Sequence, residues 1–198
     1  MNEDAKHEFY IGTYTNGESN GIYYSEFSES NGFLEPKLVA ETSNPSYLVS
    51  DGNTLYSVNE MIPDKDHGGI TSFSIEENLV QLSSISANGL YPCYISLGKD
   101  SQNLFVANYG TGNVLSINVH DDAFKVVSDI QHEGTGPDSS RQEGPHAHFI
   151  RQHRNGKVYA ADLGADKVYI YDLHDNGELS PAGQYNAKPG SGPRHISF

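Results

Sequence analysis

The stretch Leu104-Phe105-Val106-Ala107-Asn108-Tyr109, followed by Asn113-Val114-Leu115-Ser116-Ile117-Asn118-Val119, decides the fold. Its second segment alternates between two faces along the chain, which is typical of a half-buried β-strand. The same pair of segments recurs three more times: Phe9–Tyr14 with Gly21–Phe27, Leu55–Glu60 with Gly69–Ile75, and Val158–Leu163 with Lys167–Leu173. The chain is therefore predicted to repeat one supersecondary unit.

A proline opens most of these units, and four such prolines are spaced 47, 53 and 48 residues apart: Pro45, Pro92, Pro145 and Pro193. Each unit reads as four short strands separated by turn residues, and no stretch has the apolar spacing of a long helix. Four strands in about 45 residues is the size of a propeller blade, and a blade must stack on its neighbours to bury its faces. The prediction is an all-β propeller, since a β-sandwich needs no such repeat.

The chain is expected to be one partial propeller domain, residues 1–198. Its blades are expected at roughly 9–43, 44–91, 92–143 and 144–192, with the start of another at 193–198. About four blades are thus present, and a complete propeller of seven would need roughly 330 residues. We expect the chain to be a fragment whose open blade faces self-associate.

The composition limits the kinds of partner that the protein is expected to bind. The net charge of −14 argues against nucleic acid, so an anionic ligand would need a local basic pocket. No run is long and apolar enough for a membrane span, and the polar segment Met1–Glu8 does not resemble a signal peptide. We expect a cytoplasmic protein. The single cysteine, Cys93, excludes an intrachain disulfide and is expected to be a small buried residue.

Two clusters at blade starts could carry chemistry: Gly144-Pro145-His146-Ala147-His148-Phe149 and Gly192-Pro193-Arg194-His195. Aligned on their prolines, His146 and Arg194 occupy the same place in successive blades. Both could reach one ligand in the central channel, because the innermost strand of each blade lines it. A neutral imidazole can take a proton from water, and a guanidinium can grip an anion or stabilise an oxyanion.

A structural interpretation of these clusters is also open. The earlier units carry Pro45-Ser46-Tyr47 and Pro92-Cys93-Tyr94 at the same place, so His195 could be a packing group like the tyrosines. Glu60 and Asp162, at the ends of matching strands, are candidate carboxylates or turn-capping groups. His146 and His148 make too few ligands for a good metal site, so neither a metal nor a cofactor is expected.

The remaining histidines lie in predicted turns, strand ends or the N-terminal tail and are expected on the solvated surface: His7, His67, His120, His132, His153 and His174. The polar insertion Asp138–Glu143 precedes the His146 cluster. Inserted loops of repeat proteins often lie on a functional face.

Five motifs together resemble one family: Tyr10–Thr15, Ala107–Gly110, Gly144–His148, Ala161–Asp166 and Gly192–His195. They are similar to motifs of the seven-bladed propeller lactonases, a family that includes 6-phosphogluconolactonases and is related to fungal carboxymuconate-lactonizing enzymes. The resemblance covers nearly the whole chain. It implies a metal-independent hydrolase of cyclic sugar esters, acting on 6-phosphogluconolactone in the pentose phosphate pathway.

By analogy with the lactonizing relatives, the resemblance implies that His146 and Arg194 belong to the active site. His146 would be the general base and Arg194 would bind the acidic group or polarise the carbonyl, with His148 or His195 orienting the pair. Those relatives also use a glutamate and a second arginine from later blades, beyond the last residue of this chain. Two other functions stay open, a muconate-type lactonizing cycloisomerase and a non-enzymatic propeller that binds a protein or polysaccharide.

Overall fold

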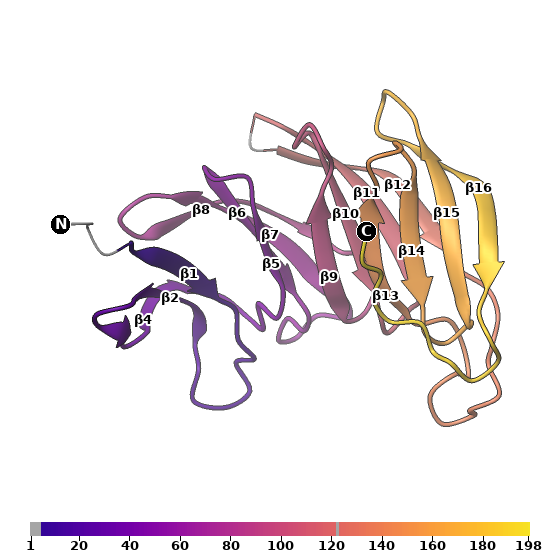
Figure 1. Ribbon diagram of the computed structural model, residues 1–198, viewed down its shortest axis with the longest axis horizontal. Coiled ribbons are helices and arrows are strands. Elements are labelled where there is room, and N and C mark those ends of the chain that lie inside the picture. The colour runs from indigo at the N-terminus through magenta and orange to yellow at the C-terminus, as the bar shows by residue number, and fades with distance from the viewer. Residues whose placement is uncertain (1–4, 122) are drawn as a thin grey trace.

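The computed structural model describes residues 5–121 and 123–198, so the segment Met1–Glu8 is described only from residue 5. Four antiparallel sheets follow one another along the molecule (Figure 1). These residues form strands and turns without a helix, which confirms the all-β prediction of four-stranded blades. In this described part, nothing helical is long and apolar enough to cross a membrane.

In the residues that the structure describes, sixteen strands make up the four sheets. The first sheet holds β1 (His7–Ile11), β2 (Gly21–Ser28), β3 (Gly32–Phe33) and β4 (Lys37–Glu41). The second holds β5 (Leu48–Ser50), β6 (Thr54–Asn59), β7 (Gly69–Ile75) and β8 (Leu79–Ser86). The third holds β9 (Pro92–Leu97), β10 (Asn103–Asn108), β11 (Asn113–His120) and β12 (Ala123–Gln131). The fourth holds β13 (Ala147–Gln152), β14 (Val158–Asp162), β15 (Lys167–Leu173) and β16 (Leu179–Asn186).

Sequence neighbours pair with one another in the last three sheets, as expected for strands joined by tight turns. The first sheet differs, because β3 and β4 both pair with β2 and together act as its outer strand. In the repeat, β1 corresponds to the second strands β6, β10 and β14. Among residues 5–121 and 123–198, the first sheet therefore has no counterpart of the first strands β5, β9 and β13.

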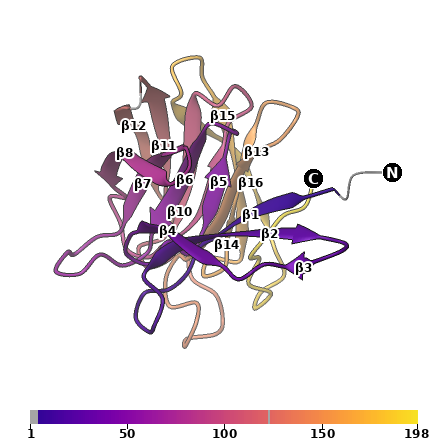
Figure 2. The ribbon, with the colours of Figure 1, turned by 90° about the vertical axis from the view of Figure 1, so that its left-hand side faces the viewer.

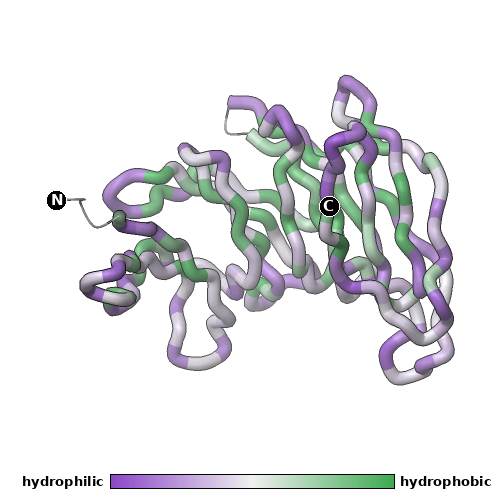
Figure 3. The backbone as a smooth tube through the Cα atoms, viewed as in Figure 1, coloured by the Kyte–Doolittle hydropathy of each residue, from purple (hydrophilic) through white to green (hydrophobic). Residues whose placement is uncertain are grey.

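The core lies between neighbouring sheets. The four consecutive residues from Leu104 to Ala107 in β10 are fully buried, because the second strand of a blade is covered on both faces. Phe105 belongs to a buried cluster that includes Ile150 of the next sheet, while Val106 belongs to a cluster that includes Val58 of the preceding one. Figure 3 shows the corresponding pattern, with hydrophobic strands and hydrophilic loops. The two faces of one strand thus bind two neighbouring blades.

The first strands β5, β9 and β13 pack directly against one another, so they lie nearest the axis about which the sheets are arranged. The outer strands β4, β8 and β12 also meet their neighbours, and Figure 2 shows the sheets stacked one behind another. The connections before β5, β9 and β13 and those after β6, β10 and β14 all lie at one end of the molecule. That end carries the predicted site residues.

A side chain at the end of each second strand joins its blade to the previous one. Asn59 donates a hydrogen bond to the Thr42 hydroxyl (2.8 Å), just after β4. At the next junction, Asn108 donates to the carbonyl oxygen of Ala87 (2.8 Å), just after β8. Asp162 occupies the same place in the fourth sheet. Its position in the repeat therefore indicates a role in holding blades together.

Candidate functional site

The strand register corrects the alignment of the blade starts. In the third sheet, Asn108 lies opposite Pro92 and Ala107 opposite Tyr94, so Cys93 is the extra residue of a β-bulge. In the fourth sheet, Asp162 lies opposite Ala147 and Ala161 opposite Phe149, so His148 is the extra residue. Because Asn108 and Asp162 hold the same place in the repeat, His148 matches Cys93.

The expectation that His146 occupies the place of Cys93 and Arg194 is therefore wrong by two residues. Pro145 stands two residues earlier relative to its strand than Pro92 does, after the longer connection that contains Asp138–Glu143. Arg194 lies close enough to His148 for its positive charge to lower the pKa of the His148 imidazole.

An aromatic column runs from blade to blade beside the bulges. Tyr47 packs on Tyr94 with ring centroids 4.4 Å apart, and Tyr94 packs on Phe149 at 4.7 Å. His195 continues the column, 6.3 Å from Phe149. Its ring also lies edge-on to His148 at 5.1 Å. His195 thus has the packing role that its alignment with the tyrosines predicts, and it also flanks His148.

His148 has one ring nitrogen without a hydrogen-bond partner. This Nδ1 atom is buried, and no group in the described part of the chain bonds to it. Burial, followed by the positive charge of Arg194 and a smaller electrostatic contribution from His195, lowers the pKa of His148 to about 4. The imidazole is therefore neutral at neutral pH, next to an exposed guanidinium. The sequence predicted a histidine base beside a guanidinium, but it named His146 as the base and His148 as an orienting residue.

Both ring nitrogens of His146 contact neighbouring groups. Its Nδ1 contacts the carbonyl oxygen of Tyr109 (2.8 Å) and its Nε2 contacts the carboxylate of Glu143 (3.2 Å). The ring also stacks on Tyr109, with centroids 4.5 Å apart and planes 15° apart. Both ring nitrogens of His146 therefore already have protein partners, whereas Nδ1 of His148 has none in the described residues.

Three residues that follow β1, β6 and β10 hold one place in the repeat: Tyr14, Glu60 and Tyr109. Partial burial, then a hydrogen bond to Glu60, raises the pKa of Tyr14 to about 12. Burial also raises the pKa of the Glu60 carboxyl, while the bond from Tyr14 opposes that shift. Tyr109 lies edge-on to His148 at 5.9 Å. Glu60 and the tyrosines offer polar groups suited to ligand hydroxyls.

Asp162 lies beneath the site and is fully buried. One carboxylate oxygen accepts from the backbone N–H groups of His146 (2.8 Å) and Ala165 (2.9 Å). The other accepts from His132 Nδ1 (2.7 Å), and His132 Nε2 accepts from the Tyr171 hydroxyl (2.8 Å). Asp162 therefore holds the segment that leads to His148, and it is placed to act on His148 through that segment.

His132 is only 2% exposed, so the expectation of a solvated surface residue is wrong. It directly follows β12, at the place that Thr42 and Ala87 occupy in earlier blades. It therefore faces the blade junction, where Asp162 meets it and Tyr169 stacks on its ring at 3.8 Å.

Arg194 depends on a fixed loop. The Asp166 carboxylate accepts hydrogen bonds from the backbone N–H groups of Gly190 (2.7 Å) and Gly192 (2.8 Å), just before Arg194. Nearby, Gly164 leaves no room for a side chain, because a Cβ atom there would collide with the carbonyl oxygen of Gly144 and press on the His146 ring. The turn after β14 thus positions both halves of the site.

Cys93 lies between charged groups, yet it is a poor nucleophile. Burial, then the negative charge of Glu60, raises the pKa of its thiol to about 12, although Arg194 opposes the shift. We expect Cys93 to resist a thiol reagent at pH 8 in the native protein and to react at once in denaturant. Absorbance of the released reagent measures both rates. Fast labelling without denaturant would contradict the burial of this thiol.

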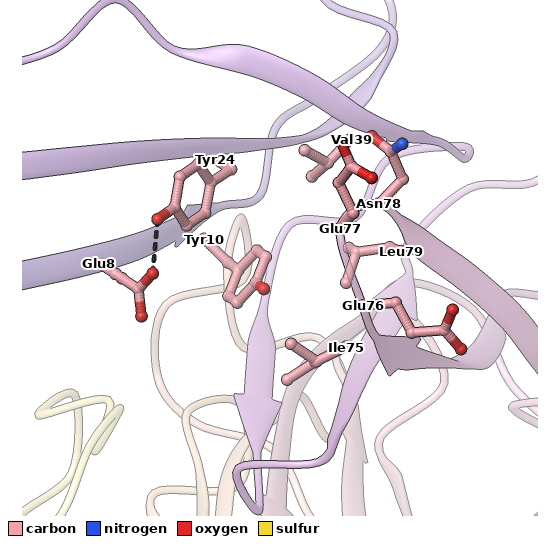
Figure 4. Close-up of a pocket in the computed structure, with 9 residues that line it drawn as sticks. All are labelled: Glu8, Tyr10, Tyr24, Val39, Ile75, Glu76, Glu77, Asn78 and Leu79. Carbon is pink, nitrogen blue, oxygen red and sulfur yellow. Dashed lines mark hydrogen bonds between the residues drawn. The ribbon is translucent and has the colours of Figure 1, made fainter.

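A separate pocket of about 300 Å³ lies between the first and second sheets (Figure 4). Its lining residues are Glu8, Tyr10, Tyr24, Val39, Ile75, Glu76, Glu77, Asn78 and Leu79. Tyr24 donates a hydrogen bond to Glu8 (2.7 Å) inside it. With three carboxylates and no cation in its lining, this pocket does not suit an anionic ligand. The His148–Arg194 pair, which includes a cation, suits an anionic ligand better.

The sequence predictions placed six residues in one site: Glu60, His146, His148, Asp162, Arg194 and His195. The structure brings Glu60, His148, Arg194 and His195 together. His146 lies beside them, against Tyr109. Asp162 lies behind the site. The predictions missed Tyr14 and Tyr109, which their shared place with Glu60 in the repeat could have revealed. They also missed Asp166. No group of three or more His, Cys, Asp or Glu side chains in the described ranges could hold a metal ion. The absence of a metal or cofactor stays a prediction.

Comparisons with known proteins agree on one family. Residues 8–198 match the family model described as lactonase, 7-bladed beta-propeller. The chain is 38% identical over 205 residues to a 6-phosphogluconolactonase of Bacillus subtilis, covering 98% of this chain and 57% of that protein. A structure of a periplasmic gluconolactonase from Pseudomonas aeruginosa superposes with a TM-score of 0.83 at 33% identity, over 98% of this chain and 59% of its own. A Lactobacillus plantarum protein superposes with a TM-score of 0.89 at 33% identity, over 96% and 56%.

Proposed function

The chain belongs to the family of seven-bladed β-propeller lactonases, and on this premise we propose that the whole protein hydrolyses a sugar lactone. The proposed reaction converts 6-phosphogluconolactone to 6-phosphogluconate, as the name of the Bacillus subtilis relative suggests. The chain spans 57% of the length of that relative, so the activity proposed is that of the whole protein.

The observation that supports this proposal best is the neutral His148 imidazole beside the Arg194 guanidinium. In the proposed reaction, His148 accepts a proton from water while the water oxygen attacks the lactone carbonyl carbon. The charge that develops on the carbonyl oxygen is stabilised by Arg194. The ring C–O bond then breaks, and the departing oxygen takes the proton back from His148. Water is consumed, and the carboxylic acid that forms releases its proton to the solvent and becomes a carboxylate.

The surrounding groups fit a polyhydroxylated substrate. Glu60 and Tyr14 can exchange hydrogen bonds with sugar hydroxyls, since a carboxylate accepts and a phenol both donates and accepts. His195 and Tyr109 flank His148 and restrict its ring. His146 is a positioning residue in this scheme, since its bonds to Tyr109 and Glu143 fix the chain before His148.

The other functions weighed from the sequence gain no support of their own. A lactonizing cycloisomerase would use the same His–Arg pair, and no contact in the site favours it over hydrolysis. A purely binding propeller does not require a neutral base beside a cation. The cytoplasmic location stays a prediction, and one similar structure is named as a periplasmic gluconolactonase. Self-association and the absence of nucleic-acid partners also stay predictions.

Proton release tests the proposed function. The whole protein is mixed with 6-phosphogluconolactone, D-glucono-lactone or carboxymuconolactone in weak buffer, and the rate is corrected for spontaneous hydrolysis. We expect catalysed release with the sugar lactones, most rapid with the phosphorylated one. Turnover of carboxymuconolactone alone would favour the cycloisomerase, and no turnover of any substrate would refute the lactonase.

A further inference from the structure

The connection between β12 and β13 is a rigid loop that extends past the site. Gln142 is buried in it, and its Nε2 donates a hydrogen bond to the carbonyl oxygen of Leu163 (2.8 Å), in the turn after β14. The carbonyl oxygen of Asp138 accepts from the backbone N–H groups of Arg141 (3.1 Å) and Gln142 (2.7 Å). Gly136 donates back to the carbonyl oxygen of Gln142 (3.0 Å). In Figure 1 this loop projects from the end of the molecule that carries the site.

This loop presents Arg141 to the site through one aromatic ring. The Arg141 guanidinium donates to the Tyr109 hydroxyl (3.3 Å). The Tyr109 ring stacks on His146 and lies edge-on to His148, with centroids 5.9 Å apart. Arg141 is thus separated from His148 by a single side chain, and it lies on a different element from Arg194.

The charge of Arg141 is available to a ligand. Within residues 5–121 and 123–198, no carboxylate lies within 4.0 Å of its guanidinium. The carboxylates that act on it from farther away, Asp138 and Glu143, have other partners. Asp138 accepts from the Ser140 hydroxyl (2.7 Å), and Glu143 contacts His146 (3.2 Å). In a chain of net charge −14, an arginine left without an ion pair beside the site suggests an anionic partner.

We propose that Arg141 binds the phosphate of the substrate. The phosphate lies at the opposite end of the substrate from the lactone carbonyl, whose oxygen Arg194 stabilises. This inference rests on the proposed function. A sugar lactone phosphate needs two cationic contacts, because the phosphate and the reacting carbonyl lie at different ends of the same molecule. A guanidinium on a rigid loop suits phosphate, since its planar fork can donate two parallel hydrogen bonds. Arg141 thereby selects phosphorylated over unphosphorylated sugars.

Calorimetric binding of the reaction products tests this inference independently of turnover. The whole protein and its Arg141→Ala and Arg141→Lys variants are titrated with 6-phosphogluconate and with gluconate. Arg154→Ala is the matched control, because Arg154 is an exposed arginine past the opposite end of β13. We expect Arg141→Ala to weaken 6-phosphogluconate binding by about 10- to 100-fold, with gluconate unchanged. Arg141→Lys should lie between, because it keeps the charge and loses the fork.

Three outcomes would overturn the role of Arg141. Arg141→Ala could bind 6-phosphogluconate as the wild type does, or it could lose affinity equally for both ligands. The wild-type protein could also bind 6-phosphogluconate and gluconate with equal affinity. Lactone turnover is measured on the same preparations. If turnover is absent while the phosphate-dependent loss is present, the lactonase proposal fails and the anion site stands. If turnover is present and Arg141→Ala prefers 6-phosphogluconate over gluconate as strongly as the wild type does, the lactonase proposal stands and the role of Arg141 fails.

Discussion

Replacing His148 with alanine is expected to lower kcat for lactone hydrolysis by about 10²- to 10⁴-fold, the usual contribution of a general base. His148 is the neutral imidazole beside Arg194, and its pKa is lowered to about 4. In the wild type, kcat/KM should therefore be flat at neutral pH and fall only below about pH 4, where His148 becomes protonated and can no longer accept a proton. Initial rates of lactone consumption across pH 3 to 8, at about one-unit steps, measure this profile.

The kcat profile should differ from that of kcat/KM. A phosphorylated substrate brings negative charge near His148, and this charge offsets part of the effect of the Arg194 cation, which is one cause of the lowered pKa of His148. Since kcat reports groups in the enzyme–substrate complex, its acid limb should lie at higher pH than the limb of kcat/KM. His120→Ala is the control, because the His120 side chain is 87% exposed and remote from the site. A His148→Ala enzyme with wild-type kcat, together with an inactive His146→Gln enzyme, would assign the base to His146 instead.

Sequence reasoning could predict the blades because the pattern that encodes them is local. Buried second strands such as Leu104–Ala107 and alternating third strands such as Val114–Val119 repeat with similar spacing, and each repeat specifies the same hairpins. The sequence could not predict the register of the first strand in each blade. A β-bulge adds one residue to one strand only, so proline spacing could not show that His148, rather than His146, matches Cys93.

The burial of His132 could not be predicted, because no neighbouring blade carries a similar residue there. Thr42 and Ala87 take this place at the other two junctions, where Asn59 and Asn108 contact them as neutral groups. His132 is buried because its partner, Asp162, lies 30 residues later and reaches it only across the junction between the blades. The same limit applies to Arg141, whose contact with Tyr109 depends on the loop conformation.

Replacing Asp162 with alanine should produce the largest loss of stability, about 3–5 kcal/mol in the free energy of unfolding. The change leaves His132 and the N–H group of His146 without their acceptor in a site that water does not reach. Domains of ordinary stability have about 5–15 kcal/mol in total, so the variant should unfold at much lower urea concentration. Urea titration followed by circular dichroism measures the loss.

Two further variants separate burial from charge. Asp172→Ala removes an ion pair with Lys157 (2.6 Å) in which the two side chains are 52% and 40% exposed, and it should cost only about 0–1 kcal/mol. Asp162→Asn keeps an oxygen for the backbone N–H groups, and its amide can donate to His132 Nδ1 if the imidazole proton moves to Nε2 and is donated to Tyr171. Because Asn108 fills this place in the neighbouring blade, we expect Asp162→Asn to lose much less stability than Asp162→Ala. Equal losses in both Asp162 variants would show that the negative charge itself, rather than the hydrogen bonds, holds this junction together.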